Sequence, residues 1–167
     1  MNIKQLIDLI EKKIKDPKKS LPEDIFLLLS RISPLVNVDL LIKNKKNQIL
    51  LTWRQKGQVY PEGWHIPGGI IRYKEKFTNR IKEVAKNELN CKINFNDNPI
   101  EINQIFLNQK NRGHFISLLF KCKLITNPSK KLEYVKGNPN IGEWMWHSKC
   151  PKELIIPHKI YKKYFKK

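Results

Sequence analysis

A glycine-rich segment runs into an amphipathic helix between residues 63 and 90, and this pairing restricts the fold more than any other feature. After GWHIPGG, apolar residues recur at the spacing of one helical face: Phe77, Ile81, Val84, Ala85 and Leu89. Glu88 falls about 20° from Phe77 on the helical wheel, inside this face. A carboxylate on the core-facing side of a helix has to be paired, protonated or bound to a metal. The alternative is a frayed helix end, with Glu88 reaching water.

The remaining pattern predicts one α/β domain of 167 residues. Helical periodicity covers residues 3–15, 25–31, 77–89 and 157–165, and strand-like segments cover 36–42, 48–53, 100–107, 114–125 and 142–147. The polar turn 43–47 predicts a hairpin between the first two strands, and 55–63 reads as a loop. Helices that flank a mixed β-sheet make an α/β/α sandwich. Residues 1–20 form an N-terminal helical extension to the domain at 21–167, and we expect it to cap the sheet or to contribute to a dimer contact.

The net charge of +18 favours an anionic partner, such as a phosphorylated ligand, nucleic acid or an acidic membrane surface. Only five of the 33 cationic residues are Arg. The Lys residues are spread along the chain with much Asn and Ile, which the codon bias of an AT-rich genome also produces. Proteins that read nucleic acid rely on Arg for bidentate contacts, and the sequence carries no known nucleic-acid motif. We therefore expect a small phosphorylated ligand and no nucleic acid.

The sequence gives no sign of a membrane or an oxidising environment. No apolar run approaches the roughly 18 residues that span a bilayer, and the N-terminus lacks the apolar core of a signal peptide. The three cysteines are far apart in the sequence and form no CxxC motif, so we expect buried or free thiols. These features predict a cytoplasmic protein with no membrane partner.

The spacing of the glycine-rich segment and helix resembles the signature of the Nudix hydrolases. That signature has a Gly, five residues, a Glu, seven residues and then REUxEExGU, where U is a bulky apolar residue. Gly69 and Glu75 match its first half, and Glu88 falls on the last of its clustered acids. Four positions depart from it: Glu83, Val84, Asn87 and Asn90. The signature is therefore degenerate, and Glu83, on the far side of the helix from the apolar face, reads as a solvated acid.

The flanking sequence resembles one Nudix branch, the GDP-mannose mannosyl hydrolases, over residues 21–165. The segment Leu21–Ile42 is similar to the start of those enzymes, and LLTWR (Leu50–Arg54) followed by GWHIPGG continues the likeness. That branch also lacks most of the signature acids and keeps the one that matches Glu88. The resemblance implies an α/β/α sandwich and a homodimer in solution.

The resemblance also implies a metal-dependent hydrolase of a nucleoside diphosphate sugar. A divalent cation, Mg²⁺ or Mn²⁺, neutralises the diphosphate in such enzymes. In this branch attack at the sugar carbon releases the nucleoside diphosphate. The metal ligands align with the carbonyl of Gly68 or Gly69, with Glu88, and with Asn140. A tight turn at the glycines and a plain turn residue at Asn140 are the structural alternatives.

Further site residues follow from the same alignment. Arg54 matches an arginine that grips the diphosphate, although a strand-end Arg exposed to solvent is an alternative. Asp39 lies among apolar neighbours at a position that belongs to the family's substrate site, or it forms a structural salt bridge. The family's Arg after the glycines is replaced by Ile70, and Arg72 would lie on the same strand face. In the signature an arginine pairs with the residue at Glu75, but here Glu83 occupies the position of that arginine. Arg80 or a lysine therefore has to supply the partner of Glu75.

The catalytic base is the least defined residue, because Ile141 occupies the position of the family's histidine. His114 is predicted on the strand that faces the site, and His65 beside the glycines is a second candidate. A lone strand His is more often structural. Phe115 also replaces a substrate-facing Tyr, which leaves the sugar open. Two alternatives remain: a Nudix pyrophosphatase that attacks phosphorus in another nucleoside diphosphate derivative, and a degenerate Nudix domain that binds nucleotide without turnover.

Overall fold

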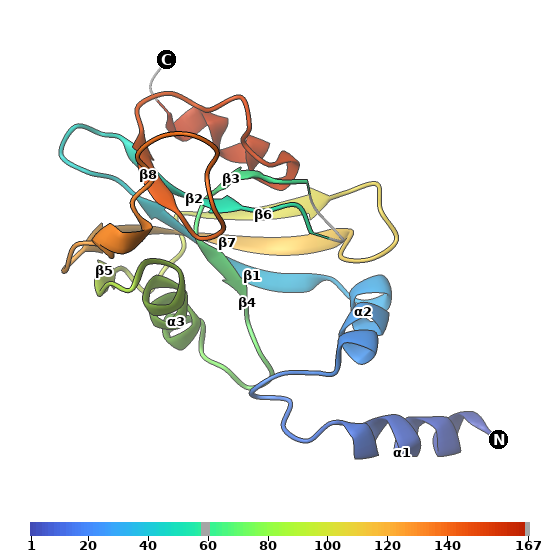
Figure 1. Ribbon diagram of the computed structural model, residues 1–167. Helices are drawn as coiled ribbons and strands as arrows, with labels where there is room; N and C mark the ends of the chain where they lie inside the picture. The colour runs from blue at the N-terminus through green and yellow to red at the C-terminus, as the bar shows by residue number, and fades with distance from the viewer. Residues whose placement is uncertain (58–60, 166–167) are drawn as a thin grey trace.

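The computed structural model describes residues 1–57 and 61–165 (Figure 1). Its helices are α1 (Ile3–Lys13), α2 (Glu23–Ile32) and α3 (Phe77–Leu89), with the 3-10 helices η1 (Lys130–Leu132) and η2 (Ile156–Tyr164). Its strands are β1 (Leu35–Ile42), β2 (Ile49–Arg54), β3 (Gly63–His65), β4 (Gly68–Ile70), β5 (Ile93–Phe95), β6 (Glu101–Phe106), β7 (His114–Leu124) and β8 (Trp144–His147). The predicted loop 55–63 includes residues 58–60, which lie outside the described residues.

The strands form two sheets, and the larger one is mixed, as predicted. It has the order β4-β1-β7-β5, with β6 also paired to β7. β1 and β7 run parallel, and the other pairs in this sheet are antiparallel. The smaller sheet has the antiparallel order β3-β2-β8. The combination of this mixed sheet with helices confirms the predicted α/β class.

The predicted hairpin between the first two strands is wrong. β1 and β2 belong to different sheets and are joined only by an isolated bridge between Lys43 and Ile49. The turn itself forms, because the Asn44 side chain accepts hydrogen bonds from the backbone of Lys46 and Gln48. Beyond it the strands diverge, since both are buried on both faces and each needs its own neighbours. Alternation of apolar and polar residues cannot reveal which sheet a strand joins.

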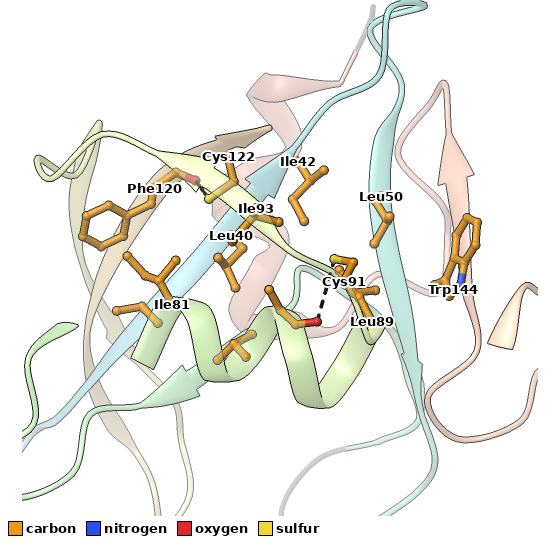
Figure 2. Close-up of a cluster of buried hydrophobic side chains, with 13 residues drawn as sticks. Leu40, Ile42, Leu50, Ile81, Leu89, Cys91, Ile93, Phe120, Cys122 and Trp144 are labelled. Atoms are coloured by element: carbon orange, nitrogen blue, oxygen red, sulfur yellow. Dashed lines mark hydrogen bonds between the residues drawn. The ribbon is translucent and has the colours of Figure 1, made fainter. Parts of the chain in front are cut away.

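Two apolar cores lie on opposite faces of β1. Val38, Leu40 and Ile42 point into a core that also contains the buried face of α3 (Figure 2). Leu41 points the other way, into a core shared with β2, β3 and η2. Side chains alternate along a strand, so Asn37 and Asp39 share the face of Leu41 and look toward η2. A polar site can therefore form between η2 and the larger sheet.

Helix α3 has the predicted bounds and the predicted apolar face. Ile81, Val84, Ala85 and Leu89 are buried, as is Arg80, while Glu83 is exposed. The helix ends where Asn90 adopts the left-handed conformation, with φ of 48°. This end carries Glu88 to the region where β2, β3 and β4 meet.

The N-terminal helix α1 does not cap the sheet. None of its residues is buried, and in Figure 1 it projects from the body of the domain. Its possible part in a dimer contact stays a prediction. Within the described part of the chain, no helix is both long enough and apolar enough to cross a membrane.

Candidate active site

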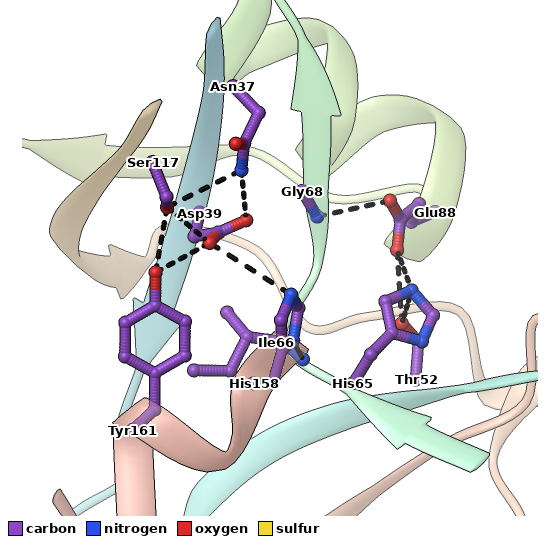
Figure 3. A network of polar contacts seen from close by, with 10 residues as sticks. All are labelled: Asn37, Asp39, Thr52, His65, Ile66, Gly68, Glu88, Ser117, His158 and Tyr161. Carbon is purple, nitrogen blue, oxygen red and sulfur yellow. Dashed lines mark hydrogen bonds and ion pairs between the residues drawn. The ribbon is translucent and has the colours of Figure 1, made fainter. Parts of the chain in front are cut away.

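Two carboxylates flank the backbone of Gly68 in β4 (Figure 3). On one side, Asp39 of β1 is the register partner of Gly68. A Cβ atom on Gly68 would lie 2.3 Å from Asp39 Oδ1, so only glycine fits beside this carboxylate. On the other side, the Gly68 backbone N–H donates to Glu88 Oε1 at 3.2 Å. The glycine-rich segment therefore brings the two acids that the sequence singled out to a single strand.

The Glu88 carboxylate is held by neutral donors and remains partly open to solvent. Thr52 of β2 donates its hydroxyl hydrogen to Glu88 Oε2 at 3.0 Å. His65 of β3 lies near the same oxygen, with Nε2 at 3.5 Å, and the Glu88 side chain is 27% exposed. The end of α3 at Glu88 is therefore not frayed, and Glu88 does not form a buried ion pair.

The Asp39 carboxylate lies in a dry network of hydroxyl and amide groups. Its Oδ2 accepts hydrogen bonds from Ser117 of β7 and Tyr161 of η2, both at 2.6 Å, and its Oδ1 accepts from Asn37 Nδ2 at 2.9 Å. Burial raises the pKa of Asp39, and the three hydrogen bonds oppose that rise. The same burial, and the neighbouring carboxylate, raise the pKa of Tyr161, so its hydroxyl stays a donor.

Two histidines face this region, and their hydrogen bonds fix the position of the ring proton. His158 Nδ1 accepts from the Ile66 backbone N–H at 2.9 Å, so a neutral His158 carries its proton on Nε2. His65 Nε2 lies 3.1 Å from Thr52 Oγ1. Because that hydroxyl donates to Glu88, it can only accept from His65, which places the His65 proton on Nε2 as well.

Asp39, Gly68 and the two histidines line one pocket of about 160 Å³ between β1, β4 and η2, whereas Glu88 and Tyr161 lie outside its lining. Two guanidinium groups, Arg54 and Arg112, supply positive charge, and Asp39 with His158 supplies a polar wall. Phe115 and Ile155 contribute apolar surface. The pocket therefore combines phosphate-binding and hydroxyl-binding groups in one small volume.

Comparison with known proteins identifies the fold. No protein-family model matches the sequence, and no curated protein matches it either. Solved structures do match. A possible asymmetric diadenosine tetraphosphate hydrolase from Jonesia denitrificans has a TM-score of 0.61 at 15% identity, over 80% of this chain and 92% of its own. The chain has the Nudix fold.

Two more structures with this fold support the assignment. A MutT NUDIX hydrolase from Burkholderia pseudomallei has a TM-score of 0.59 at 15% identity, over 80% of this chain and 99% of its own. A UDP-X diphosphatase has a TM-score of 0.53 at 17% identity, and it covers 96% of this chain and 87% of its own. At these identities the likeness defines the Nudix fold, and the chemistry has to be argued from the site.

The donor atoms around Glu88 fit one Mg²⁺ that takes most of its ligands from substrate and water. Among the described residues, no cluster of three or more His, Cys, Asp or Glu side chains could hold a metal. In β4 the residues on either side of Gly68 pair with β1, so Gly68 directs its own N–H and C=O to the opposite side, where Glu88 lies. Mg²⁺ commonly binds one or two carboxylates together with phosphate oxygens and water. One carboxylate and one carbonyl meet that minimum.

The Nudix fold brings some of the other predicted residues to the pocket and leaves others outside it. Asp39, Arg54 and Gly68 all line it. Asn140 is exposed, and its backbone and side-chain nitrogens both donate to Glu143. Its loop lies beside β2, because Gly142 and Glu143 exchange backbone hydrogen bonds with Trp53. Asn140 is thus near the end of the strand that carries Arg54, without a contact to Glu88.

Glu75 and Arg72 lie before α3 and away from the pocket lining. Glu75 pairs with Arg80, with Oε2 at 2.8 Å from Nη2 and 2.9 Å from Nε, which is one of the two partners that the sequence allowed. Arg72 donates its backbone N–H to Glu75. Its side chain is exposed, because β4 ends at Ile70 and the strand alternation does not extend to residue 72.

His114 lies on the predicted strand but on its other face. Phe115 and Ser117 of β7 point to the pocket and to Asp39, so His114 points away and stacks on Phe106, with ring centroids 4.5 Å apart. Sequence reasoning missed His158, Tyr161 and Arg112. The only signal was the segment PHKIYKKYF, where His and Tyr recur at the three-residue spacing of one face of a 3-10 helix.

Proposed function

We propose that the chain is a divalent-metal-dependent hydrolase of a nucleoside diphosphate sugar, similar to the GDP-mannose mannosyl hydrolases. The observation that carries this proposal is the composition of the pocket. Two guanidinium groups and hydroxyl-binding groups line the same cavity, and its lining residue Gly68 is hydrogen-bonded to Glu88, a carboxylate that fits a metal. A nucleoside diphosphate sugar carries matching groups, an anionic diphosphate next to a hydroxyl-rich ring.

The diphosphate is assigned to Arg54 and Arg112. Arg54 enters from the end of β2, and Arg112 from the loop between β6 and β7. Guanidinium groups pair two phosphate oxygens at once, and a pocket with limited water strengthens that attraction. The net charge of +18 adds a long-range field that attracts an anionic substrate. The predicted role of Arg54 is kept, and Arg112 takes the place that the sequence gave to Arg72.

Glu88 and the Gly68 carbonyl would hold Mg²⁺, or Mn²⁺ in its place, with Asn140 retained as a third candidate ligand. The bound cation supplies neutralisation of diphosphate charge. Thr52 fixes the orientation of Glu88 by its hydrogen bond, and the Gly68 N–H does the same from the other oxygen. Glu75 acts at a distance, because its pair with Arg80 ties the loop before α3 to the helix.

His65 is the better candidate for the base. It lines the pocket, and its Nδ1 is buried and has no hydrogen-bond partner among the described residues. With the ring proton on Nε2, Nδ1 carries the free electron pair that a base needs. His114 faces away from this cavity, so its predicted role is transferred to His65.

Binding without turnover is a second candidate function, and one observation favours it. Glu88 is the only carboxylate at the proposed metal position in the described residues, and both of its oxygens already accept hydrogen bonds. The predicted homodimer and the absence of a nucleic-acid partner rest on the resemblance and on composition. Light scattering of the purified protein tests the dimer.

The test compares wild type, Glu88→Gln and Glu83→Gln with Mg²⁺ and a panel of nucleotide sugars, with products separated by chromatography. Glu83 is exposed on the same helix, so its variant controls for the change in charge. We expect release of nucleoside diphosphate that falls about 100-fold or more only in Glu88→Gln. Release of nucleoside monophosphate would show that the attack takes place at phosphorus and not at the sugar carbon. Tight binding with no product in wild type would support the binding-only domain.

A further inference from the structure

His158 presents a fixed hydrogen-bond donor to the pocket. It lies near the start of η2, and only 8% of its surface is exposed. Its Nδ1 is occupied by the Ile66 backbone N–H at 2.9 Å, which leaves the proton on Nε2. Burial lowers the pKa of His158 well below 6.5, with help from nearby His65 and Arg54, so the ring stays neutral at neutral pH. A ring in this state donates from Nε2 and cannot accept a proton there.

The Nε2–H group faces a gap beside the Asp39 carboxylate. Nε2 is 4.0 Å from Asp39 Oδ2, which is too long for a hydrogen bond. An oxygen atom placed about 2.8 Å from each group would bridge them. A single hydroxyl group in the pocket can therefore contact both His158 and Asp39.

Some hydrogen-bond acceptors around this gap have no donor among the described residues. A carboxylate offers about four acceptor positions: Ser117 and Tyr161 occupy the two on Asp39 Oδ2, and Asn37 occupies one on Oδ1, so the remaining position is on Oδ1. Asn37 Oδ1, in the same pocket, is buried and has no hydrogen-bond partner within the described part of the chain. Buried polar atoms are nearly always hydrogen-bonded, so an unpaired acceptor in the pocket that His158 also lines points to a polar ligand.

We propose that His158 and Asp39 bind one hydroxyl group of the substrate sugar, which makes His158 a residue that determines specificity. A hydroxyl accepts from His158 and donates to Asp39 at the same time, whereas a phosphate oxygen only accepts and an ammonium group only donates. Phosphate is also disfavoured next to the Asp39 carboxylate. The inference rests on the proposed function, because it assigns the sugar half of the same pocket.

Two variants separate the pocket role of His158 from its structural role. His158→Asn keeps an acceptor near the position of Nδ1, so it retains the bond from Ile66 and removes the donor in the pocket. His158→Gln keeps a donor near the position of Nε2 and removes the acceptor for Ile66. A purely structural role predicts that Gln is the more damaging substitution.

The experiment measures dissociation constants by calorimetry for GDP-mannose, UDP-glucose and the matching free diphosphates GDP and UDP, with Mg²⁺ in the Glu88→Gln background to prevent turnover. In His158→Asn we expect binding of the preferred nucleotide sugar to weaken about tenfold, while the free diphosphate changes less than about twofold. His158→Gln should retain most of the preference for the sugar. An equal loss for sugar and diphosphate in His158→Asn, or no loss, would overturn the inference.

Failure of the proposed function gives a different result. In that case no nucleoside diphosphate or nucleotide sugar binds the wild-type protein. The hydroxyl site is then tested with free mannose and glucose at high concentration, by the ¹⁵N signals of the His158 ring. A change in the Nε2–H signal of wild type, absent in Asp39→Asn, would support the site without the nucleotide. An unchanged signal would overturn both proposals.

Discussion

The two acids that flank Gly68 have the same functional group and opposite surroundings. Asp39 is 1% exposed, has a raised pKa and is surrounded by hydroxyl and amide donors. The Glu88 side chain is 27% exposed and is held by one backbone N–H and one hydroxyl. A cation that binds Glu88 keeps part of its water, whereas a cation at Asp39 would lose nearly all of it. The comparison separates the acid that we propose to bind metal from an acid that organises hydroxyl groups.

Gly68→Ala should disrupt both sides at once and give the largest effect. The new methyl group would lie 2.3 Å from Asp39 Oδ1 and 2.9 Å from the Val38 carbonyl oxygen, so β4 has to move away from β1. We expect a loss of about 2 kcal/mol in the free energy of unfolding, together with loss of turnover. Urea denaturation and the product assay measure the two effects. Gly57→Ala is the control, because no atom lies within 4 Å of its new methyl group. Equal stability of the two variants would show that β4 is not held between the two acids.

Asp39→Asn should show that Asp39 and Glu88 act on different ligands. The amide replaces one acceptor oxygen with a donor, so a sugar hydroxyl loses its partner, and we expect binding of a nucleotide sugar to weaken about tenfold. Magnesium dependence should stay unchanged. The folded-state pKa of Asp39 is raised, so its ionised form opposes folding as the pH rises above 3.8, and the amide removes that cost. We therefore expect only a small change in stability at pH 7, measured by thermal melting. A changed magnesium requirement would contradict the division of roles.

Low pH should destabilise the folded protein, and His158, which lies beside Asp39, should be one cause. The folded-state pKa of His158 is lowered from 6.5, so the unfolded chain takes up a proton that the folded chain refuses. The free energy of unfolding should therefore fall as the pH drops below about 6.5. His147 in β8 acts in the same direction, since burial lowers its pKa to about 4. Urea titrations between pH 7 and pH 4.5 should give a shallower fall in His158→Asn than in wild type. Identical slopes in the two proteins would show that His158 does not cause the sensitivity to acid.

Thr52→Val should give the smallest effect, and it acts on Glu88 and on His65, the two partners of the Thr52 hydroxyl. Valine has nearly the shape of threonine and lacks the hydroxyl that donates to Oε2. We expect kcat/KM to fall about fivefold, the loss typical of one hydrogen bond, and the free diphosphate to bind as in wild type. Thr126→Val is the control, because it removes the acceptor for the Lys92 N–H, far from the pocket in sequence and outside its lining. If both variants lose activity equally, the bond from Thr52 has no specific role.

Local pattern predicted the parts of the site that lie on a regular element. The period of α3 placed Glu88 on its inner face, and the apolar neighbours of Asp39 predicted its burial. The pattern could not show on which face of a strand a side chain lies, or which distant residue it contacts. His114 is on the expected strand and points away, because a shift of one residue exchanges the two faces. His158 comes from a 3-10 helix that begins 86 residues after the end of β4, and nothing in its own neighbourhood reveals the Asp39 that it faces.

The position of η2 in the chain has a consequence for synthesis. His158 lines the pocket, yet it follows every other lining residue in sequence order. While the chain is being made, both sheets and α3 can assemble before the Ile66 backbone N–H and the Asp39 carboxylate receive their last partners. The residues that hold Glu88 are therefore synthesised well before His158, which completes the proposed hydroxyl-binding side of the pocket.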